Sequence, residues 1–330
     1  MKLKRVKFKH PFILGLLLLV IIVLVSALIA HIMQIQKNTL RPARSSNTLF
    51  DGYGIYESCS PKHSADCLSH LNTMAAAGFT LVINYGELYG DARFQQAYLD
   101  RAQSVGMKVI IGLSNPTFYN GKDLRSNFPA LAKTCNCTGN HGFIQYVVNL
   151  AKNHPAVWGY YIGDEIDPGD HDKMKSALAD VVRQLDPKHP RLFIDNPGHT
   201  TATWHGNSPF FDTAEVIGSD FYPIRDDSSD YPTIDQTAQV ASGVQAYANA
   251  YGEDSAIVLQ AFSYSQYHIP HTLYPTADQM ESLLSQTLAH AHPRIVLWYS
   301  YYDTMSYHHA MQHWDDLKSV IARHMPKLAH

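Results

Sequence analysis

Apolar and polar positions beyond residue 46 follow one pattern that is repeated eight times. Each unit begins with a short run of β-branched and aromatic residues, passes through a polar loop, and ends in a segment with helical periodicity. The runs that predict strands are Leu49–Tyr56, Thr80–Tyr85, Lys108–Leu113, Val157–Gly163, Arg191–Asp195, Glu215–Phe221, Ala256–Phe262 and Ile295–Tyr301. The segments that predict helices are Ser64–Ala77, Ala92–Val105, Gly142–Asn153, His171–Leu185, Ile234–Tyr251, Ala277–Ala291 and Ala310–His324. The stretch Thr201–Thr213 is short and irregular, and it is the weakest of the eight units.

Strict alternation of strand and helix predicts a parallel sheet whose outside is covered by helices. Eight such units within residues 47–330 favour an α/β fold of the (β/α)8 TIM barrel type over an open doubly wound sheet. Tyr56-Glu57-Ser58-Cys59, directly after the first strand, also lacks the glycines of a dinucleotide-binding turn. We therefore expect a closed barrel.

The N-terminus has the pattern of a membrane anchor. Five basic residues within positions 2–9 precede an uncharged apolar run from Phe12 to Ala30, which is long enough to cross a bilayer as a helix. The positive flank predicts a cytoplasmic N-terminus and an exported barrel. We expect residues 1–33 to be stub and anchor and residues 34–46 a polar linker. The alternative is a signal peptide cleaved near Val25-Ser26-Ala27, followed by secretion.

Composition narrows the classes of function. The net charge of −3 comes without a basic face, which argues against a nucleic-acid partner. The four cysteines, Cys59, Cys67, Cys135 and Cys137, all fall in the exported part, where disulfides can form, and Cys59–Cys67 is the pairing that is easiest to picture. Cys135 and Cys137 are too close together for a standard zinc site. We expect no metal and no cofactor.

Candidate chemistry lies at the carboxyl ends of the strands, where barrels of this kind place their active sites. Acids, amides and aromatics gather at these positions, as expected for a site that binds a neutral, hydroxyl-rich ligand. They are Glu57, Asn84, Glu87, Asn115, Asp164, Glu165, Asp195, Asp220, Tyr222, Gln260 and Trp298.

The sharpest motif is Trp158-Gly159-Tyr160-Tyr161-Ile162-Gly163-Asp164-Glu165. An apolar strand that runs directly into two acids places them at its rim, because the body of the strand is packed on both sides. Neighbouring carboxylates raise each other's pKa, and a carboxyl group that stays protonated can act as a general acid. The alternative is that one of the two acids caps the next helix or pairs with an arginine.

This pattern resembles clan A glycoside hydrolases, over most of residues 47–325. The acidic pair ending strand four, Ser219-Asp220-Phe221-Tyr222-Pro223 on strand six, and Trp298 on strand eight carry the resemblance. It implies that Glu165 is the acid/base, that Asp164 stands where Asn is usual, and that Tyr222 and Trp298 line a sugar site. One departure concerns strand seven, where the clan has its nucleophilic Glu and this chain has Gln260.

Three routes remain open. In the first, the enzyme inverts, with Glu165 as acid and Asp220 activating water across the roughly 6.5–9.5 Å that inversion needs. In the second, an N-acetyl group of the substrate attacks, with Asp164 orienting it and Glu165 donating the proton. In the third, catalysis is lost and the barrel only binds sugar.

Other barrel chemistries fit less well. The first strand has no His-x-His for an amidohydrolase metal site, and strands four to eight contain no lysine for a Schiff base. We therefore expect an extracytoplasmic O-glycosyl hydrolase that acts on an oligo- or polysaccharide. The alternative is a membrane-tethered barrel that binds carbohydrate without turnover.

Overall fold

The computed structural model describes residues 50–61, 66–114, 118, 120–196, 208–226, 233–263, 272–301 and 310–325. These residues belong to one compact unit, Thr48–His330. Within them, no helix combines the length and the apolar character needed to span a membrane. The expected anchor and linker in residues 1–46 lie outside the described residues and stay predictions, as does most of the weak unit Thr201–Thr213.

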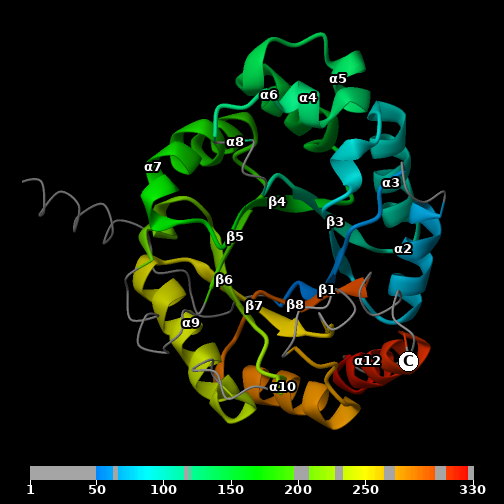
Figure 1. Cartoon of the computed structure of the whole chain (residues 1–330), viewed down its shortest axis with the longest axis vertical. Coiled ribbons are helices and arrows are strands. Elements are labelled where there is room, and N and C mark those ends of the chain that lie inside the picture. The colour runs from blue at the N-terminus through cyan, green and yellow to red at the C-terminus, as the bar shows by residue number, and fades with distance from the viewer. Residues whose placement is uncertain are drawn as a thin grey trace, which may run out of the picture. The chain divides into compact units, whose positions relative to one another are not determined.

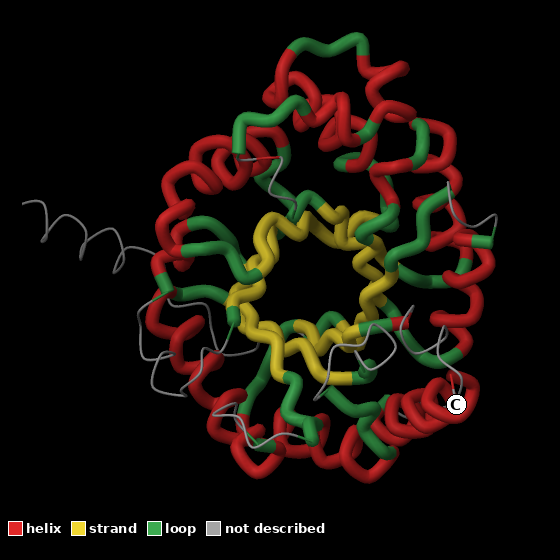
Figure 2. Tube along the Cα trace, viewed as in Figure 1, coloured by secondary structure: helices red, strands yellow, loops and turns green. Residues whose placement is uncertain are grey.

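Eight parallel strands form a closed barrel in chain order, and β1 pairs with β8 to complete it (Figures 1 and 2). The strands are β1 (Gly52–Glu57), β2 (Leu81–Asn84), β3 (Lys108–Gly112), β4 (Val157–Asp164), β5 (Arg191–Asp195), β6 (Val216–Phe221), β7 (Asp254–Gln260) and β8 (Ile295–Tyr299). Each overlaps one of the eight predicted runs. The expectation of a (β/α)8 barrel is confirmed.

Helices surround the ring of strands (Figure 2). They are α2 (Cys67–Ala76), α3 (Ala92–Ser104), α4 (Leu124–Asn127), α5 (Pro129–Cys135), α6 (Gly139–Ala151), α7 (His171–Met174), α8 (Asp180–Leu185), α9 (Thr237–Tyr251), α10 (Ala277–His290) and α12 (Ala310–His324). A π-helical turn, Lys175–Ala179, joins α7 to α8 within the single helix that the periodicity predicts. The pattern gave no indication of α4 and α5, which precede α6.

Each strand contributes to two apolar layers, because successive side chains on a strand point to opposite sides of the sheet. The inner layer fills the bore and includes Leu81, Ile83, Ile110, Leu192, Ile194, Val216, Val258, Ile295 and Leu297. The outer layer packs against the helices and includes Ile55, Val82, Val109, Ile111, Phe193, Ile217, Ile257, Leu259 and Val296. The side on which a residue falls therefore decides whether it can reach a site in the bore.

Strand β4 contains an extra residue that changes which of its side chains face the bore. Tyr161 and Asp164 are three residues apart, yet they oppose Leu192 and Ile194 of β5, which are two apart. A bulge of this kind shifts the alternation by one residue. It directs both Tyr161 and Asp164 toward the bore.

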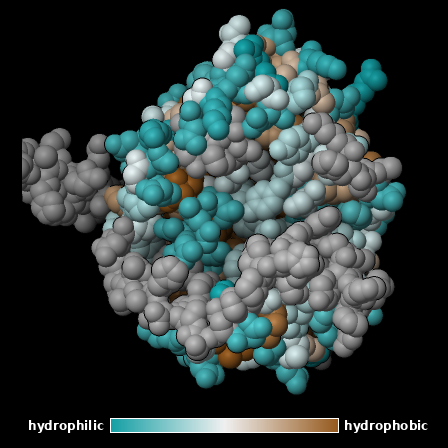
Figure 3. Space-filling model, viewed as in Figure 1, coloured by the Kyte–Doolittle hydropathy of each residue, from teal (hydrophilic) through white to brown (hydrophobic). Residues whose placement is uncertain are grey.

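The described surface is mostly polar. Where Figure 3 colours the surface by hydropathy, most of the residues are hydrophilic or intermediate and the hydrophobic areas are small. Among the described residues, the large hydrophobic side chains that are exposed are Phe50, Leu273 and Met325. The apolar residues of the barrel are thus largely used in its two internal layers.

Two disulfides lie in the barrel unit. Cys59 pairs with Cys67, as the sequence favoured, and joins the loop after β1 to the first turn of α2. Cys135 pairs with Cys137 at the end of α5.

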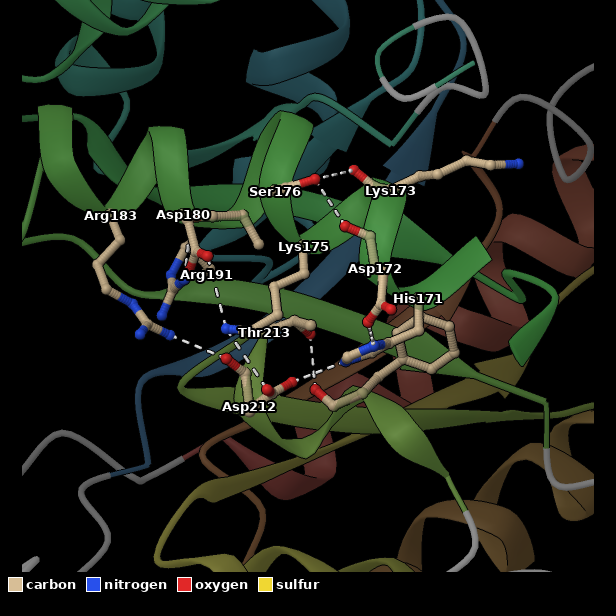
Figure 4. A network of polar contacts seen from close by, with 12 residues as sticks. His171, Asp172, Lys173, Lys175, Ser176, Asp180, Arg183, Arg191, Asp212 and Thr213 are labelled. Atoms are coloured by element: carbon tan, nitrogen blue, oxygen red, sulfur yellow. Dashed lines mark hydrogen bonds and ion pairs between the residues drawn. The ribbon is translucent and has the colours of Figure 1, made fainter. Parts of the chain in front are cut away.

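A network of polar contacts connects α7 and α8 to the residues before β6 (Figure 4). His171, Lys175 and Arg183 all reach Asp212, the first two through its carboxylate and the third through its backbone carbonyl. Beside them, Arg191 at the start of β5 is 1% exposed.

The guanidinium group of Arg191 contacts Glu215 and the backbone of Ala179. It makes a two-pronged ion pair with Glu215, in which its Nε donates to Oε2 at 2.9 Å, and its Nη1 donates to the carbonyl of Ala179 at 3.0 Å. The Glu215 side chain is 37% exposed, so the cost of losing Arg191 lies in the packing and hydrogen bonds of the buried arginine itself.

We therefore expect Arg191→Ala to lower the free energy of unfolding by roughly 3 kcal/mol. Arg183→Ala is the matched control, because its more exposed side chain lies 4.0 Å from Glu215, and we expect a loss below about 1 kcal/mol. Urea unfolding followed by far-ultraviolet circular dichroism compares the two variants. Equal losses would show that Arg191 contributes no more to the free energy of unfolding than Arg183 does.

Candidate active site

Three carboxyl groups come together at the carboxyl-terminal mouth of the barrel. Asp164 ends β4, Glu165 follows it directly, and Asp220 lies on β6. The charges of Asp164 and Glu165 both act on Asp220, so the three groups form one electrostatic cluster. The structure thus brings together the three acids that the sequence marked as catalytic candidates.

Asp164 is held by tyrosine hydroxyls. Asp164 is exposed at the mouth as a whole residue, but its carboxylate lies among tyrosines, and the hydroxyl of Tyr85, which follows β2, donates a hydrogen bond to Oδ2 at 2.9 Å. Loss of hydration inside the barrel raises the pKa of Asp164, the hydroxyls of Tyr161 and Tyr85 lower it, and the charge of Glu165 raises it. The net pKa is above its ordinary value.

Glu165 has a left-handed backbone conformation, with φ of +46°. This region costs a non-glycine residue roughly 1 kcal/mol or more, and such strain is found mainly at functional sites. The backbone N–H of Glu165 donates to the carbonyl of Ile194 at 3.0 Å, and the Asn196 amide donates to its Oε1 at 2.9 Å. The side chain is exposed, so a ligand in the mouth could reach it.

Asp220 is the buried member of the cluster, with 6% of its surface exposed. Within the described residues, its Oδ1 atom has no hydrogen-bond partner. Burial raises the pKa of Asp220 well above its usual range, and the neighbouring charges of Glu165 and Asp164 raise it further. Asp220 is therefore the member of the cluster in which burial and neighbouring charges most oppose ionisation.

Aromatic rings surround the acids. Tyr56 is the centre of one group, with ring centroids 5.5 Å from Tyr85, 5.8 Å from Tyr161 and 5.4 Å from Tyr299. Tyr299 continues into a second group, in which Phe262 lies 5.0 Å from Tyr299 and 4.8 Å from Tyr222. Rings with a polar edge provide both apolar surface and hydroxyl groups to a ligand.

Tyr222 lies where the sequence places it, on the bore side of the barrel. Trp298 does not. It is fully buried in the outer layer between β8 and the helices, because its neighbours in the strand, Leu297 and Tyr299, are the residues that face the bore. The expected strand-eight platform is therefore corrected from Trp298 to Tyr299.

Glu57, Asn84 and Glu87 also lie outside the bore, contrary to the expectation that they line a sugar site. Glu57 contacts His70 of α2, while Asn84 folds back to accept a hydrogen bond from the backbone of Gly86. Burial raises the pKa of Glu87 to about 8. Each of the three side chains is about 1% exposed or less.

Gln260 is a structural clasp. Its Oε1 accepts from the backbone of Ile224 at 2.8 Å, and its Nε2 donates to the carbonyls of Ile224, Phe262 and Leu273. The side chain is fully buried and joins the loops after β6 and β7. With both ends of its amide engaged, Gln260 has little capacity left for the substrate contact that was expected of it.

Asp195 lies beside the cluster. Its half-buried carboxylate accepts from the backbone of Asn196 at 2.9 Å, and its pKa is raised by burial and by the charge of Glu165. Asn115 lies outside the described residues, so its role stays a prediction.

The candidate list left out Asn196, Tyr56, Tyr85 and Tyr299, although Asn196 directly follows Asp195 at the predicted end of strand five. A count of alternate positions from Leu297 would have found Tyr299, since residues two apart on a strand share a face. The contact of Asn196 with Glu165 follows the end of β5 and has no comparable signal in the sequence.

A separate cavity of about 670 Å3 lies at the opposite, amino-terminal end of the strands. Its lining includes Lys108, Lys152, Lys188, Trp158 and Arg294. Arg294 is paired with Asp51 and Asp254. This end of the barrel contains none of the three clustered acids and is not the candidate active site.

Comparisons with solved structures show what the barrel is similar to. A protein assigned as an alpha-L-fucosidase from Bacteroides thetaiotaomicron superposes with a TM-score of 0.56 at 13% identity, covering 86% of this chain and 97% of that one. A β-galactosidase from Marinomonas ef1 gives a TM-score of 0.56 at 12% identity, and a family 5 glycoside hydrolase from Bacteroides vulgatus gives 0.51 at 13%. The matches cover 82% and 76% of this chain, which spans 59% of the length of each of those two proteins.

The chain shares its fold with glycoside hydrolases. No protein-family model matches the sequence, and no curated protein matches it. At this level of identity the likeness establishes the fold, and the chemistry has to be argued from the residues of the mouth.

The cluster makes a testable electrostatic prediction. We expect Glu165→Gln to lower the pKa of Asp220, because the change removes the nearest negative charge that disfavours ionisation. Carbon-13 NMR of labelled aspartate side chains over a pH series measures the shift. Glu87→Gln is the control, since Glu87 lies outside the bore and should leave the titration of Asp220 unchanged.

Proposed function

We propose that this protein is a glycoside hydrolase that uses Glu165 as its general acid. The observation that carries the proposal is the cluster of Asp164, Glu165 and Asp220 at the mouth of a closed barrel, within a wall of tyrosines. Asp220 is buried and its pKa is raised, whereas Glu165 is exposed and can meet a ligand. In this proposal Glu165 delivers a proton to the glycosidic oxygen, and the raised pKa of Asp220 beside it favours a proton within the cluster.

The mouth argues against two ways of attacking the sugar. The usual strand-seven carboxylate is replaced by Gln260, whose amide is occupied by backbone groups. Asp220 is badly placed to activate water on the far side of the sugar, because its carboxyl group interacts directly with the Glu165 side chain. A direct contact between the two carboxyls leaves no room for the water and sugar that inversion places between them.

The route in which the substrate supplies its own nucleophile needs only Asp164 and Glu165. In this route an N-acetyl oxygen of the sugar attacks the anomeric carbon while Glu165 protonates the leaving oxygen. Asp164, held by Tyr85 at 2.9 Å, orients the acetamido group and stabilises the positive charge that develops on it. Water then opens the cyclic intermediate, with Glu165 as base, and the product retains its anomeric configuration.

We further propose that the barrel acts outside the cytoplasm, anchored by residues 12–30 or secreted after their cleavage. The basic flank and apolar run of the N-terminus support this proposal. Two disulfides in the barrel unit are also consistent with an oxidising compartment.

Removal of the acid tests the function itself. We expect Glu165→Gln to lower kcat on oligosaccharides by about 10²- to 10⁴-fold with an unchanged circular dichroism spectrum. Glu87→Gln makes the same chemical change outside the bore and should leave kcat within about twofold. Unchanged turnover in Glu165→Gln would remove the assignment. A wild-type protein that binds oligosaccharides but cleaves none would support the non-catalytic alternative.

A pair of substrates tests the route. We expect aryl glycosides with a 2-acetamido group to be cleaved with retention, and matched 2-hydroxy glycosides to be cleaved far more slowly, because they lack the internal nucleophile. Proton NMR of the first product gives the stereochemistry. Equal rates on both substrates, or inversion, would reject this route and leave the hydrolase proposal standing.

A further inference from the structure

A second cluster of chemically reactive side chains lies outside the bore, where the end of β1 meets the first turn of α2. The ligand atoms of Glu57, Cys59 and His70 all lie within 4.8 Å of one another. Cys67 is held at the same place by its disulfide to Cys59, with the two Cα atoms 5.5 Å apart. Two sulfurs, one imidazole nitrogen and one carboxylate are thus brought together.

Local structure explains this convergence. Glu57 is the last residue of β1, and Cys59 follows two residues later in the loop that leads to α2. Cys67 and His70 are three apart at the start of α2, so they lie on one face of the helix. The two segments therefore present two donors each.

Glu57 has an unusual environment for a carboxylate. It is 1% exposed, and within the described part of the chain neither of its oxygens has a hydrogen-bond partner. Its nearest basic group is His70 Nδ1 at 3.4 Å, which is longer than the roughly 2.7–2.9 Å of a charge-assisted hydrogen bond. A buried carboxylate in this state is costly, and a cation bound beside it would offset that cost.

We propose that reduction of the Cys59–Cys67 disulfide converts this cluster into a zinc site formed by Glu57, Cys59, Cys67 and His70. A dithiol supplies two electrons and two protons, becomes a disulfide itself, and leaves two cysteine thiols. Zn²⁺ then displaces both thiol protons and binds two thiolates, one imidazole nitrogen and one carboxylate oxygen.

The geometry suits a tetrahedral ion. With Zn–S distances of about 2.3 Å and Zn–N or Zn–O distances of about 2.0–2.2 Å, the ligand atoms of such a site lie roughly 3.2–3.8 Å apart. The donors of Glu57, Cys59 and His70 already lie within 4.8 Å, so the main movement is the separation of the two sulfurs. In the oxidised protein the same sulfurs are bonded to each other and cannot bind as thiolates.

Cobalt provides the test, because Co²⁺ bound by thiolates in a tetrahedral site has intense near-ultraviolet and visible absorption. The full-length protein is titrated with Co²⁺ before and after treatment with a phosphine reductant, which carries no thiols of its own. We expect one Co²⁺ per chain with thiolate bands after reduction, no such bands before it, and loss of the bands when Zn²⁺ is added. No bands in the reduced protein would overturn the proposal.

Three variants assign the ligands. Cys135→Ser with Cys137→Ser removes the other disulfide and should leave the cobalt spectrum unchanged, whereas Cys59→Ser with Cys67→Ser should abolish it. His70→Ala keeps the disulfide for folding and should weaken Co²⁺ binding about tenfold or more. Bands that persist in the Cys59/Cys67 double variant, or unchanged affinity in His70→Ala, would show that the metal binds elsewhere.

Discussion

The alternation of side chains across a closed parallel sheet is the constraint on which the rest of this structure depends. Closure leaves each strand with two buried faces, one toward the bore and one toward the helices. A residue at a strand end can serve a site in the mouth only if its side chain points toward the bore and not toward the helices. Asp220, Tyr222 and Tyr299 meet that condition, and Trp298 does not. Asp164 meets it because the bulge in β4 shifts the count by one residue.

The architecture could be predicted from the sequence because each strand is a compact apolar run between helical segments. The sequence could not show which face of each strand points into the bore. In a parallel barrel both faces are apolar, so Val296 and Trp298 on one side look no different from Leu297 and Tyr299 on the other. The prediction that Glu57 and Glu87 line the mouth was wrong for a related reason, because an acid near a strand end can also be buried outside the bore.

The acidic cluster could be predicted in part. The motif that ends in Asp164 and Glu165 predicted two acids at the mouth, and the position of Asp220 near the end of strand six predicted a third beside them. The raised pKa of Asp220 could not be anticipated, since it depends on burial and on the charges of Asp164 and Glu165 at the end of another strand. The left-handed backbone of Glu165 and its contact with Asn196 are equally tertiary, because they depend on how β4 and β5 end beside each other.

The hydrogen bonds of Gln260 to the loops after β6 and β7 limit which residues can replace it. A glutamate at this position would have the right length and place for a strand-seven nucleophile, yet it would lose the amide that faces three backbone carbonyls. Its charge would instead oppose those oxygens and loosen the two loops that shape the mouth. A carboxylate at residue 260 would therefore need compensating changes in the loops after β6 and β7.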